Sequence, residues 1–268
     1  ALATTLVTTP LLQLFYRPEQ QLLPSLGEQA EPLGAPADRF CVLVCVSYTG
    51  AGPGMLKVSE TLVRRSLEHS RLYALKLQRP TDRPSFYLDA GPGPRQSDSG
   101  LEPLVEQAEG QKLQVRPISF VSAQPARDIC NVAEVKGADL VLLGWHRPLF
   151  NRAALGGTVS QVLSEATTTV GVVVDRGLQT IRRVLVPFHG TEHDRAALRL
   201  AQRMATHSGI SITVLHVVKP GELPSSAVQG LSREMTELFH EPGSPGGEVA
   251  VKVVEHTDPA EAALVEAA

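Results

Sequence analysis

The sequence predicts an α/β protein made of two doubly wound parallel sheets in tandem, of which the second copy is incomplete. Two observations carry this prediction. Short apolar runs rich in valine and leucine alternate with segments of helical spacing, which is the pattern of strands buried on both faces of a parallel sheet. The same order of strands and helices then begins again near residue 180 and stops after about 90 residues.

The first copy begins with the apolar run 40–47, which ends in the glycine-rich turn 50–54. Residues 55–70 have apolar side chains at helical spacing with charges between them, and 72–77 follows as a second strand. A stretch rich in Pro, Gly and Ser, 79–100, is predicted to be a long loop. Beyond it the pattern predicts helices over 101–112, 124–136 and 158–165 and strands over 113–120, 139–144 and 169–174.

The second copy repeats three elements of the first in the same order. Each first strand is followed by a turn and by a helix rich in Ala and Leu. Three correspondences in one order predict a structural repeat that lacks counterparts of 139–174. The matched pairs are 42–44 with 184–186, both Val-Leu-Val; 72–80 with 212–220, both closed by a proline; and 113–120 with 249–255.

Charge and cysteine usage exclude several classes of function. The 25 Lys and Arg against 28 Asp and Glu give a net charge of −3 without a basic cluster, which argues against nucleic acid as a partner. Cys41 and Cys45 lie four apart in an apolar run, a spacing that suits neither zinc nor a disulfide framework, so these thiols and Cys130 are predicted to be buried and reduced. No hydrolase constellation is present, and the chain is predicted not to be an enzyme.

Two patterns resemble binding sites without meeting their requirements. Residues 50–55 follow a strand as a dinucleotide fingerprint does, but Met55 stands where the third glycine belongs, so this segment is interpreted as a permissive turn. His189 and His193 lie four apart across a turn rather than on one helix face, which argues against a metal site.

The two ends of the sequence indicate a piece of a larger protein. No charge occurs before Arg17, yet the first 16 residues are fewer than the roughly 20 that span a membrane, and they lack the basic region of a signal peptide. They are either a partly exposed helix or linker, or the end of a transmembrane helix with Tyr16 and Arg17 at the interface. We expect the second, with 1–16 as the helix end, 17–38 as a linker, and the two α/β copies at 39–177 and 178–268.

The strongest candidate for a binding site follows the strand 139–144. Gly144 ends this strand, and Gly157 with Thr158 begins the next helix after a loop of about a dozen residues. Free backbone N–H groups and the helix dipole then point at the carboxyl edge of the sheet, where open α/β sheets bind ligands and where an anion is favoured. The alternative is that Gly157 and Thr158 only cap the helix.

This segment resembles the phosphate loop of universal stress proteins, Gly-x-x-Gly, nine residues, then Gly-Ser/Thr, with Arg147 at the second glycine. The family usually carries an acidic residue after the first strand, where this sequence has Ser47, and His189 in the second copy. We therefore expect ATP binding to be weak or absent, with Arg147 either meeting a phosphate or blocking it. The resemblance implies ATP, AMP or a cyclic dinucleotide as ligand, held by Ser47, Gly144, Arg147, Gly157, Thr158 and Val159.

A second resemblance covers nearly the whole chain. The segments 128–136, 142–147 and 172–178 are similar to the cytoplasmic tail of plant and fungal monovalent cation/proton exchangers and their bacterial relatives, and 6–11 resembles the end of their last membrane helix. The ion-binding acidic residues of that family lie in its membrane domain and correspond to none of these residues.

The antiporter resemblance implies a regulatory domain at the cytoplasmic face of a membrane K⁺ or Na⁺/proton antiporter. Its expected partners are the membrane domain of the same protein and a second copy in a homodimer. Two alternatives stay open: a stand-alone tandem universal stress protein that binds ATP or AMP, and a dimerisation module without a ligand.

Overall fold

The computed structural model describes residues 39–47, 52–64, 68–78, 80, 101–145, 157–205, 209–221, 230, 233 and 249–267. The chain divides into two units, of which the first, 1–37, lies entirely outside these residues. The predicted membrane-helix end at 1–16, the linker at 17–38 and most of the predicted loop at 79–100 therefore fall outside the described part. Among the described residues, no helix is long and apolar enough to cross a membrane.

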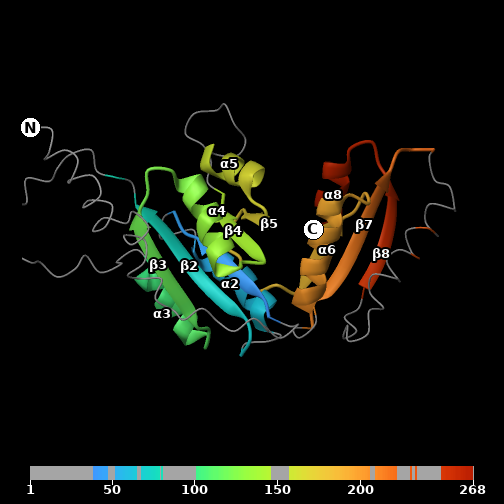
Figure 1. The fold of residues 1–268 in the computed structure, drawn as a ribbon. Helices are drawn as coiled ribbons and strands as arrows, with labels where there is room; N and C mark the ends of the chain where they lie inside the picture. Colours follow the sequence, from blue (N-terminus) through green and yellow to red (C-terminus); the bar gives the residue numbers. More distant parts are fainter. Residues whose placement is uncertain are drawn as a thin grey trace, which may run out of the picture. The chain divides into compact units, whose positions relative to one another are not determined.

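Five parallel strands form the first sheet, in the order β3-β2-β1-β4-β5 (Figure 1). The chain runs outward from β1 to β3 and then crosses to β4 and β5 on the other side, so the sheet is doubly wound, as predicted. Its elements are β1 (Cys41–Cys45), α2 (Gly52–Val63), β2 (Arg71–Gln78), α3 (Glu102–Gly110), β3 (Val115–Val121), α4 (Pro125–Lys136), β4 (Leu140–Gly144), α5 (Gly157–Glu165) and β5 (Thr169–Val173).

Three parallel strands form the second sheet, in the order β6-β7-β8. The pairing is that of β1, β2 and β3, and a helix again follows the first and the third strand. The prediction of a second, incomplete copy is therefore confirmed. Its elements are β6 (Arg183–Pro187), α6 (Glu192–Ala205), β7 (Ser211–Val218), β8 (Val249–Glu255) and α8 (Pro259–Ala267).

The continuous apolar run of β1 has a physical reason. Successive side chains of a strand point to opposite faces. Cys41 and Leu43 join a cluster with α4 and α5, whereas Val42 and Val44 join a cluster with α2 and α3. All four side chains are at most 1% exposed. Helices thus cover both faces of the first sheet, and the strand has no face on which polar residues would be favoured.

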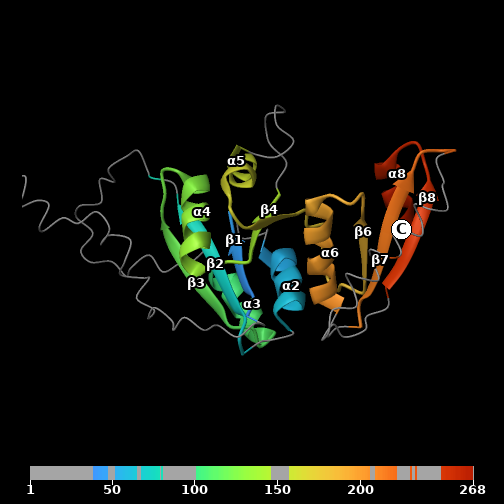
Figure 2. The same cartoon turned by 45° about the vertical axis from the view of Figure 1, so that its right-hand side comes forward.

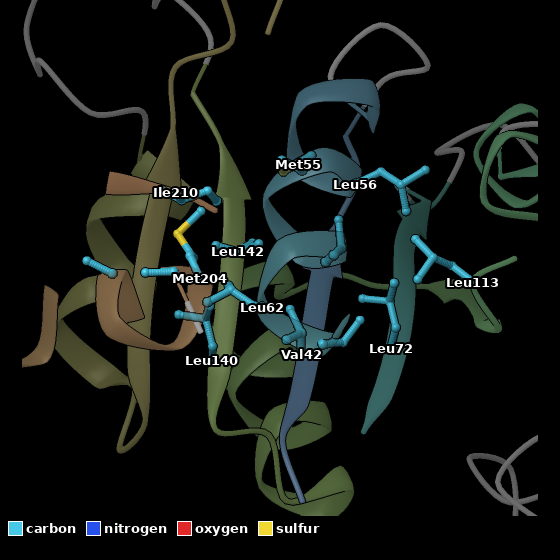
Figure 3. Close-up of a cluster of buried hydrophobic side chains, with 14 of the residues drawn as sticks. Val42, Met55, Leu56, Leu62, Leu72, Leu113, Leu140, Leu142, Met204 and Ile210 are labelled. Atoms are coloured by element: carbon cyan, nitrogen blue, oxygen red, sulfur yellow. The ribbon is translucent and has the colours of Figure 1, made fainter. Parts of the chain in front are cut away.

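The cluster beneath α2 continues into the second repeat. It joins Leu62 of α2 and Leu140 of β4 to Met204 of α6 and to Ile210, which precedes β7 (Figure 3). Helices α2 and α6 contact each other (Figure 2), and they are corresponding helices, since each follows the first strand of its repeat. The two repeats therefore share an apolar core through their first helices.

The prediction of a turn over 50–54 and a helix over 55–70 was wrong at both ends. Helix α2 begins at Gly52 and ends at Val63. Pro53 does not prevent the early start, because a proline in the first helical turn removes only an N–H that has no helical acceptor. The chain then has to return to β2 at Arg71, and a turn at Glu68 and His69 makes that connection.

Candidate functional site

The carboxyl edge of the first sheet brings together the ends of β1 and β4. Cys45 of β1 lies opposite Leu143 of β4, so Ser47 and Gly144 follow neighbouring strands at the same edge. Ser47 is exposed and Gly144 is half-buried. The chain leaves β1 toward α2 on one face and β4 toward α5 on the other. This is the switch point of the sheet, where proteins of this architecture bind ligands.

Helix α5 begins at Gly157, one residue before the predicted start. Gly157 and Thr158 are exposed, whereas Val159 is 6% exposed and belongs to the apolar cluster under α4 and α5. The first N–H groups of a helix have no acceptor within it and attract anions. Arg147, with the rest of 146–156, lies outside the described residues. Five of the six predicted site residues are thus described, at the ends of β1 and β4 and at the start of α5. That they bind a ligand together with Arg147 stays a prediction.

A carboxylate that the sequence analysis did not single out lies at the same edge. Asp175 follows β5, and its Oδ2 accepts a hydrogen bond from the backbone N–H of Gly54, in the first turn of α2, at 3.0 Å. Its Oδ1 accepts the N–H groups of Gly177 and Leu178, each at 2.9 Å. One carboxylate therefore satisfies donors from the connector between the repeats and from a helix 121 residues earlier in the chain.

These contacts lower the pKa of Asp175 from its ordinary value. The N–H of Leu178 is the largest cause; burial opposes it, and the N–H groups of Gly177 and Gly54 add to it. Donors that face an ionised carboxylate stabilise the charged form. Asp175 is therefore an anion at neutral pH, placed at the N-terminal end of α2, where the helix dipole also favours a negative charge.

The sequence contained a signal for half of this arrangement. An aspartate followed two residues later by glycine is typical of a turn in which the carboxylate accepts backbone N–H groups, and Gly177 has φ +84°, as such a turn permits. No local pattern indicates the other half, because the contact with Gly54 depends on how β5 and α2 are placed in the fold.

The corresponding edge of the second repeat carries two histidines. The rings of His189, after β6, and His216, in β7, have centroids 5.6 Å apart, and Nδ1 of His216 lies 2.7 Å from the carbonyl oxygen of Phe188. His193 lies on α6, apart from the turn that holds His189, as predicted. Within the part of the chain that the structure describes, no three His, Cys, Asp or Glu side chains gather to hold a metal ion.

The three cysteines are free thiols. Burial, with a smaller effect of Asp139, raises the pKa of Cys41 to about 11. Burial also raises the pKa of Cys45 and of Cys130. Because the thiolate is the nucleophilic form, none of these cysteines is suited to act as a nucleophile at neutral pH.

Helix α2, which lies between one face of the first sheet and α6 of the second repeat, carries an ion cluster around a buried carboxylate. Glu60 is 2% exposed; its Oε2 accepts a hydrogen bond from Lys57 Nζ at 2.7 Å, and its Oε1 is bonded to Arg64. Burial alone would raise the pKa of Glu60, but the hydrogen bonds from Lys57 and Arg64 and their charges outweigh it and lower the pKa.

We expect the Glu60 cluster to make folding stability depend on acid. A carboxylate whose pKa is lower in the folded chain contributes stability above its unfolded pKa, about 4.3, and loses it as pH falls through the folded pKa. The stability difference between the natural chain and Glu60→Gln should therefore be largest at pH 6 and shrink below about pH 4. Urea unfolding at several pH values measures this, and a difference that stays constant down to pH 3 would contradict it.

The structure is a tandem of doubly wound α/β domains, the second of them incomplete. An exposed helix N-terminus lies at the carboxyl edge of the first sheet, where such folds bind ligands. The chain belongs to the universal stress protein family, which matches residues 19–174 and 180–268. The resemblance noted in the sequence is thereby confirmed.

Relatives of this chain include membrane transporters. Cation/H(+) antiporter 18 of Arabidopsis thaliana is 29% identical over 275 residues, covering 87% of this chain and 34% of the antiporter. Cation/H(+) antiporter 20 of the same plant is 25% identical over 280 residues, covering 85% and 33%. Na(+)/H(+) antiporter NhaS5 of Synechocystis is 29% identical over 164 residues, covering 60% and 23%. The chain spans about a third of the length of the two plant antiporters and 23% of the length of NhaS5.

Solved structures with a similar fold are universal stress proteins. One from Archaeoglobus fulgidus has a TM-score of 0.53 at 17% identity, covering 84% of this chain and 82% of that one. A putative universal stress protein from Pseudomonas aeruginosa has a TM-score of 0.51 at 13% identity, covering 80% and 73%. At this identity the likeness shows the fold alone.

Proposed function

We propose that this chain is the regulatory tail of a membrane monovalent cation/proton antiporter. One observation carries the proposal. Between 81% and 87% of this chain aligns with plant cation/proton antiporters, yet the aligned part is only about a third of each antiporter. This chain, which matches that part of the antiporters, has a universal stress protein fold. We take this to support a regulatory role for the chain rather than a transporting or an enzymatic one.

In this proposal, residues 1–16 are the end of the last membrane helix, 17–38 link it to the two repeats, and the repeats lie at the cytoplasmic face. The cation is K⁺ or Na⁺. The partner is the membrane domain of the same protein, and two tails form a homodimer. The shared apolar core of the repeats supports such a role, because packed helices with two arrangements can pass a change at one site to another.

The test compares the full-length protein with a version that lacks 39–268. Both are expressed in membrane vesicles, and proton movement on addition of K⁺ or Na⁺ is followed with a pH-sensitive dye. Exchange that persists in the truncated protein with a changed rate or pH dependence supports the proposal. Identical exchange in both proteins would contradict a regulatory tail, and no cation-driven proton movement in either would contradict the antiporter assignment.

Two other functions are testable with the same material. A stand-alone tandem stress protein binding ATP or AMP is favoured by the exposed N-terminus of α5. A dimerisation module without ligand is favoured by the neutral Ser47 in place of the acidic residue of the family. Tight nucleotide binding favours the first, and concentration-dependent dimerisation without any nucleotide effect favours the second.

We infer that an adenine nucleotide, if it regulates the tail, binds weakly at Ser47, Gly144, Arg147, Gly157, Thr158 and Val159. Two charge-assisted hydrogen bonds to a phosphate contribute about 3–6 kcal/mol, whereas micromolar affinity corresponds to about 8 kcal/mol. The ribose has only the hydroxyl of Ser47 where a carboxylate would bind it more strongly. Calorimetric titration of the whole chain with ATP, AMP and a cyclic dinucleotide should give dissociation constants above about 100 μM.

Three variants assign any observed binding to this edge. Arg147→Ala and Thr158→Ala should weaken it further, and Ser47→Asp should strengthen nucleoside binding by supplying the missing carboxylate. Ser160→Ala, at the fourth residue of the same helix and outside the predicted site, is the control and should have no effect because it keeps the backbone N–H. Low-micromolar ATP binding that neither Arg147→Ala nor Thr158→Ala changes would show that the nucleotide binds elsewhere.

A further inference from the structure

We propose that Asp175 is a latch that fastens the connector between the two repeats to the first turn of α2, and that α2 thereby couples the carboxyl edge of the first sheet to the second repeat. The inference goes beyond the proposed function, because it holds for this chain whether or not an antiporter precedes it.

The latch joins the connector between the two repeats to the first helix of the first repeat. The connector, residues 174–182, follows β5 and precedes β6. Within it, Oδ1 of Asp175 holds the turn at Gly177 and Leu178, while Oδ2 holds Gly54 of α2 at 3.0 Å. One carboxylate oxygen of Asp175 therefore accepts hydrogen bonds from within the connector, and the other accepts a hydrogen bond from α2.

The first turn of α2 is shaped to receive this carboxylate. A Cβ on Gly54 would lie 2.4 Å from both Cγ and Oδ2 of Asp175, and a Cβ on Gly52 would lie 2.4 Å from Cδ1 of Leu104 in α3. Both glycines are buried. The glycines that resemble a dinucleotide fingerprint therefore leave room for close neighbours: Gly54 for the carboxylate of Asp175 and Gly52 for the side chain of Leu104.

The opposite end of α2 is bound to the second repeat. Nε of Arg203, in α6, donates a hydrogen bond to the carbonyl oxygen of Leu62 at 2.8 Å, and the guanidinium carbon lies 4.2 Å from the centroid of the Phe40 ring, which precedes β1. Leu62 and Met204 belong to the same apolar cluster (Figure 3). A movement of the first turn of α2 therefore has a rigid path to α6.

The coupling has a definite consequence for the candidate site. Ser47 follows β1, and Gly54, to which Asp175 is bonded, lies in the first turn of the next helix, α2. In this proposal a ligand at Ser47 acts on the latch through α2. Releasing the latch frees the connector, and α2 can then shift against α6. In this proposal the position of α2 depends both on the switch point of the first repeat and on the packing of the second repeat.

Hydrogen exchange measured by mass spectrometry on the whole chain tests the latch. Asp175→Asn has one acceptor oxygen instead of two. With that oxygen on the N–H groups of Gly177 and Leu178, an amide N–H₂ faces the N–H of Gly54 and the contact with α2 is lost. Gly54→Ala removes it from the other side, by displacing the carboxylate. Each variant should raise exchange about tenfold in the first turn of α2 and in the connector, a loss that corresponds to one charge-assisted hydrogen bond.

Two control variants separate the latch from general loosening. Asp258→Asn removes another carboxylate that binds backbone N–H groups, those of Ala260 and Glu261 at the start of α8. Gly110→Ala adds a methyl at a helical glycine where no described atom lies within 4 Å. Neither should change exchange in α2 or the connector. Asp175→Asn that leaves both segments as protected as in the natural chain would overturn the latch.

The coupling to the second repeat has its own test. Gly54 and Leu62 are eight residues apart, about 12 Å along the helix axis, a separation at which independent substitutions add. If α2 transmits movement, Asp175→Asn and Arg203→Met should change exchange in α6 non-additively, by more than about twofold in the double variant. Additive effects, or an α6 that Asp175→Asn leaves unchanged, would overturn the coupling.

Discussion

Phe188→Ala is expected to destabilise the second repeat by about 3–5 kcal/mol, a large part of the stability of a typical domain. Phe188 is 1% exposed at the carboxyl end of β6 and belongs to the cluster that the two repeats share. Its removal leaves a cavity in the cluster to which Leu198 of α6 and Val214 of β7 also belong. Urea unfolding followed by circular dichroism measures the loss.

Phe188→Leu is the matched control and should cost about 1 kcal/mol, since most of the buried volume is kept. The shared cluster also predicts whether the loss of stability affects one repeat or both. If the repeats unfold as one, a single transition shifts to lower urea; if they unfold separately, an early transition appears and β1 to β5 stay protected from hydrogen exchange. We expect the single transition, and Phe188→Ala with unchanged stability would contradict the shared core.

The fold could be predicted from the sequence because its signals are local and occur twice. Apolar runs such as Val42-Leu43-Val44 and Val184-Leu185-Val186 are strands by composition, and their recurrence in order gives the second copy. The helix after β3 was also predicted closely, because Pro125 at its start and Gly137 after its end are strong boundary signals. Gly137 has φ +59°, the left-handed conformation typical of a helix end.

The latch could not be predicted because its two partners are 121 residues apart. Gly52 and Gly54 were interpreted as residues that permit a turn, yet neither has the positive φ that such a turn would use. Their function is to leave space for Leu104 and Asp175, which only the placement of α3 and β5 reveals. Close approach and positive φ call for the same residue, so the sequence alone does not distinguish them.

Truncating side chains on the two packed sides of α2 is expected to affect different parts of the structure. Leu62 is 1% exposed and lies on the side of α2 toward Met204, whereas Leu56 is 0% exposed and lies on the side toward Leu113 (Figure 3). Leu62→Ala and Leu56→Ala should each cost about 2–5 kcal/mol, because each leaves a cavity in a close-packed cluster. Their effects on the second repeat should differ.

Leu62→Ala should raise hydrogen exchange in α6 well beyond Leu56→Ala, because the Leu62 side chain lies toward Met204, where the repeats meet. The backbone carbonyl oxygen that Arg203 binds is kept in both variants. Leu56→Ala should instead raise exchange in α3 and around Leu113, which belong to the same apolar cluster on that side of α2. The comparison uses one helix, one kind of truncation and similar burial, so any difference follows from position. Equal exchange of α6 in the two variants would mean that α2 does not link the repeats, and the path from the candidate site to the second sheet would have to run elsewhere.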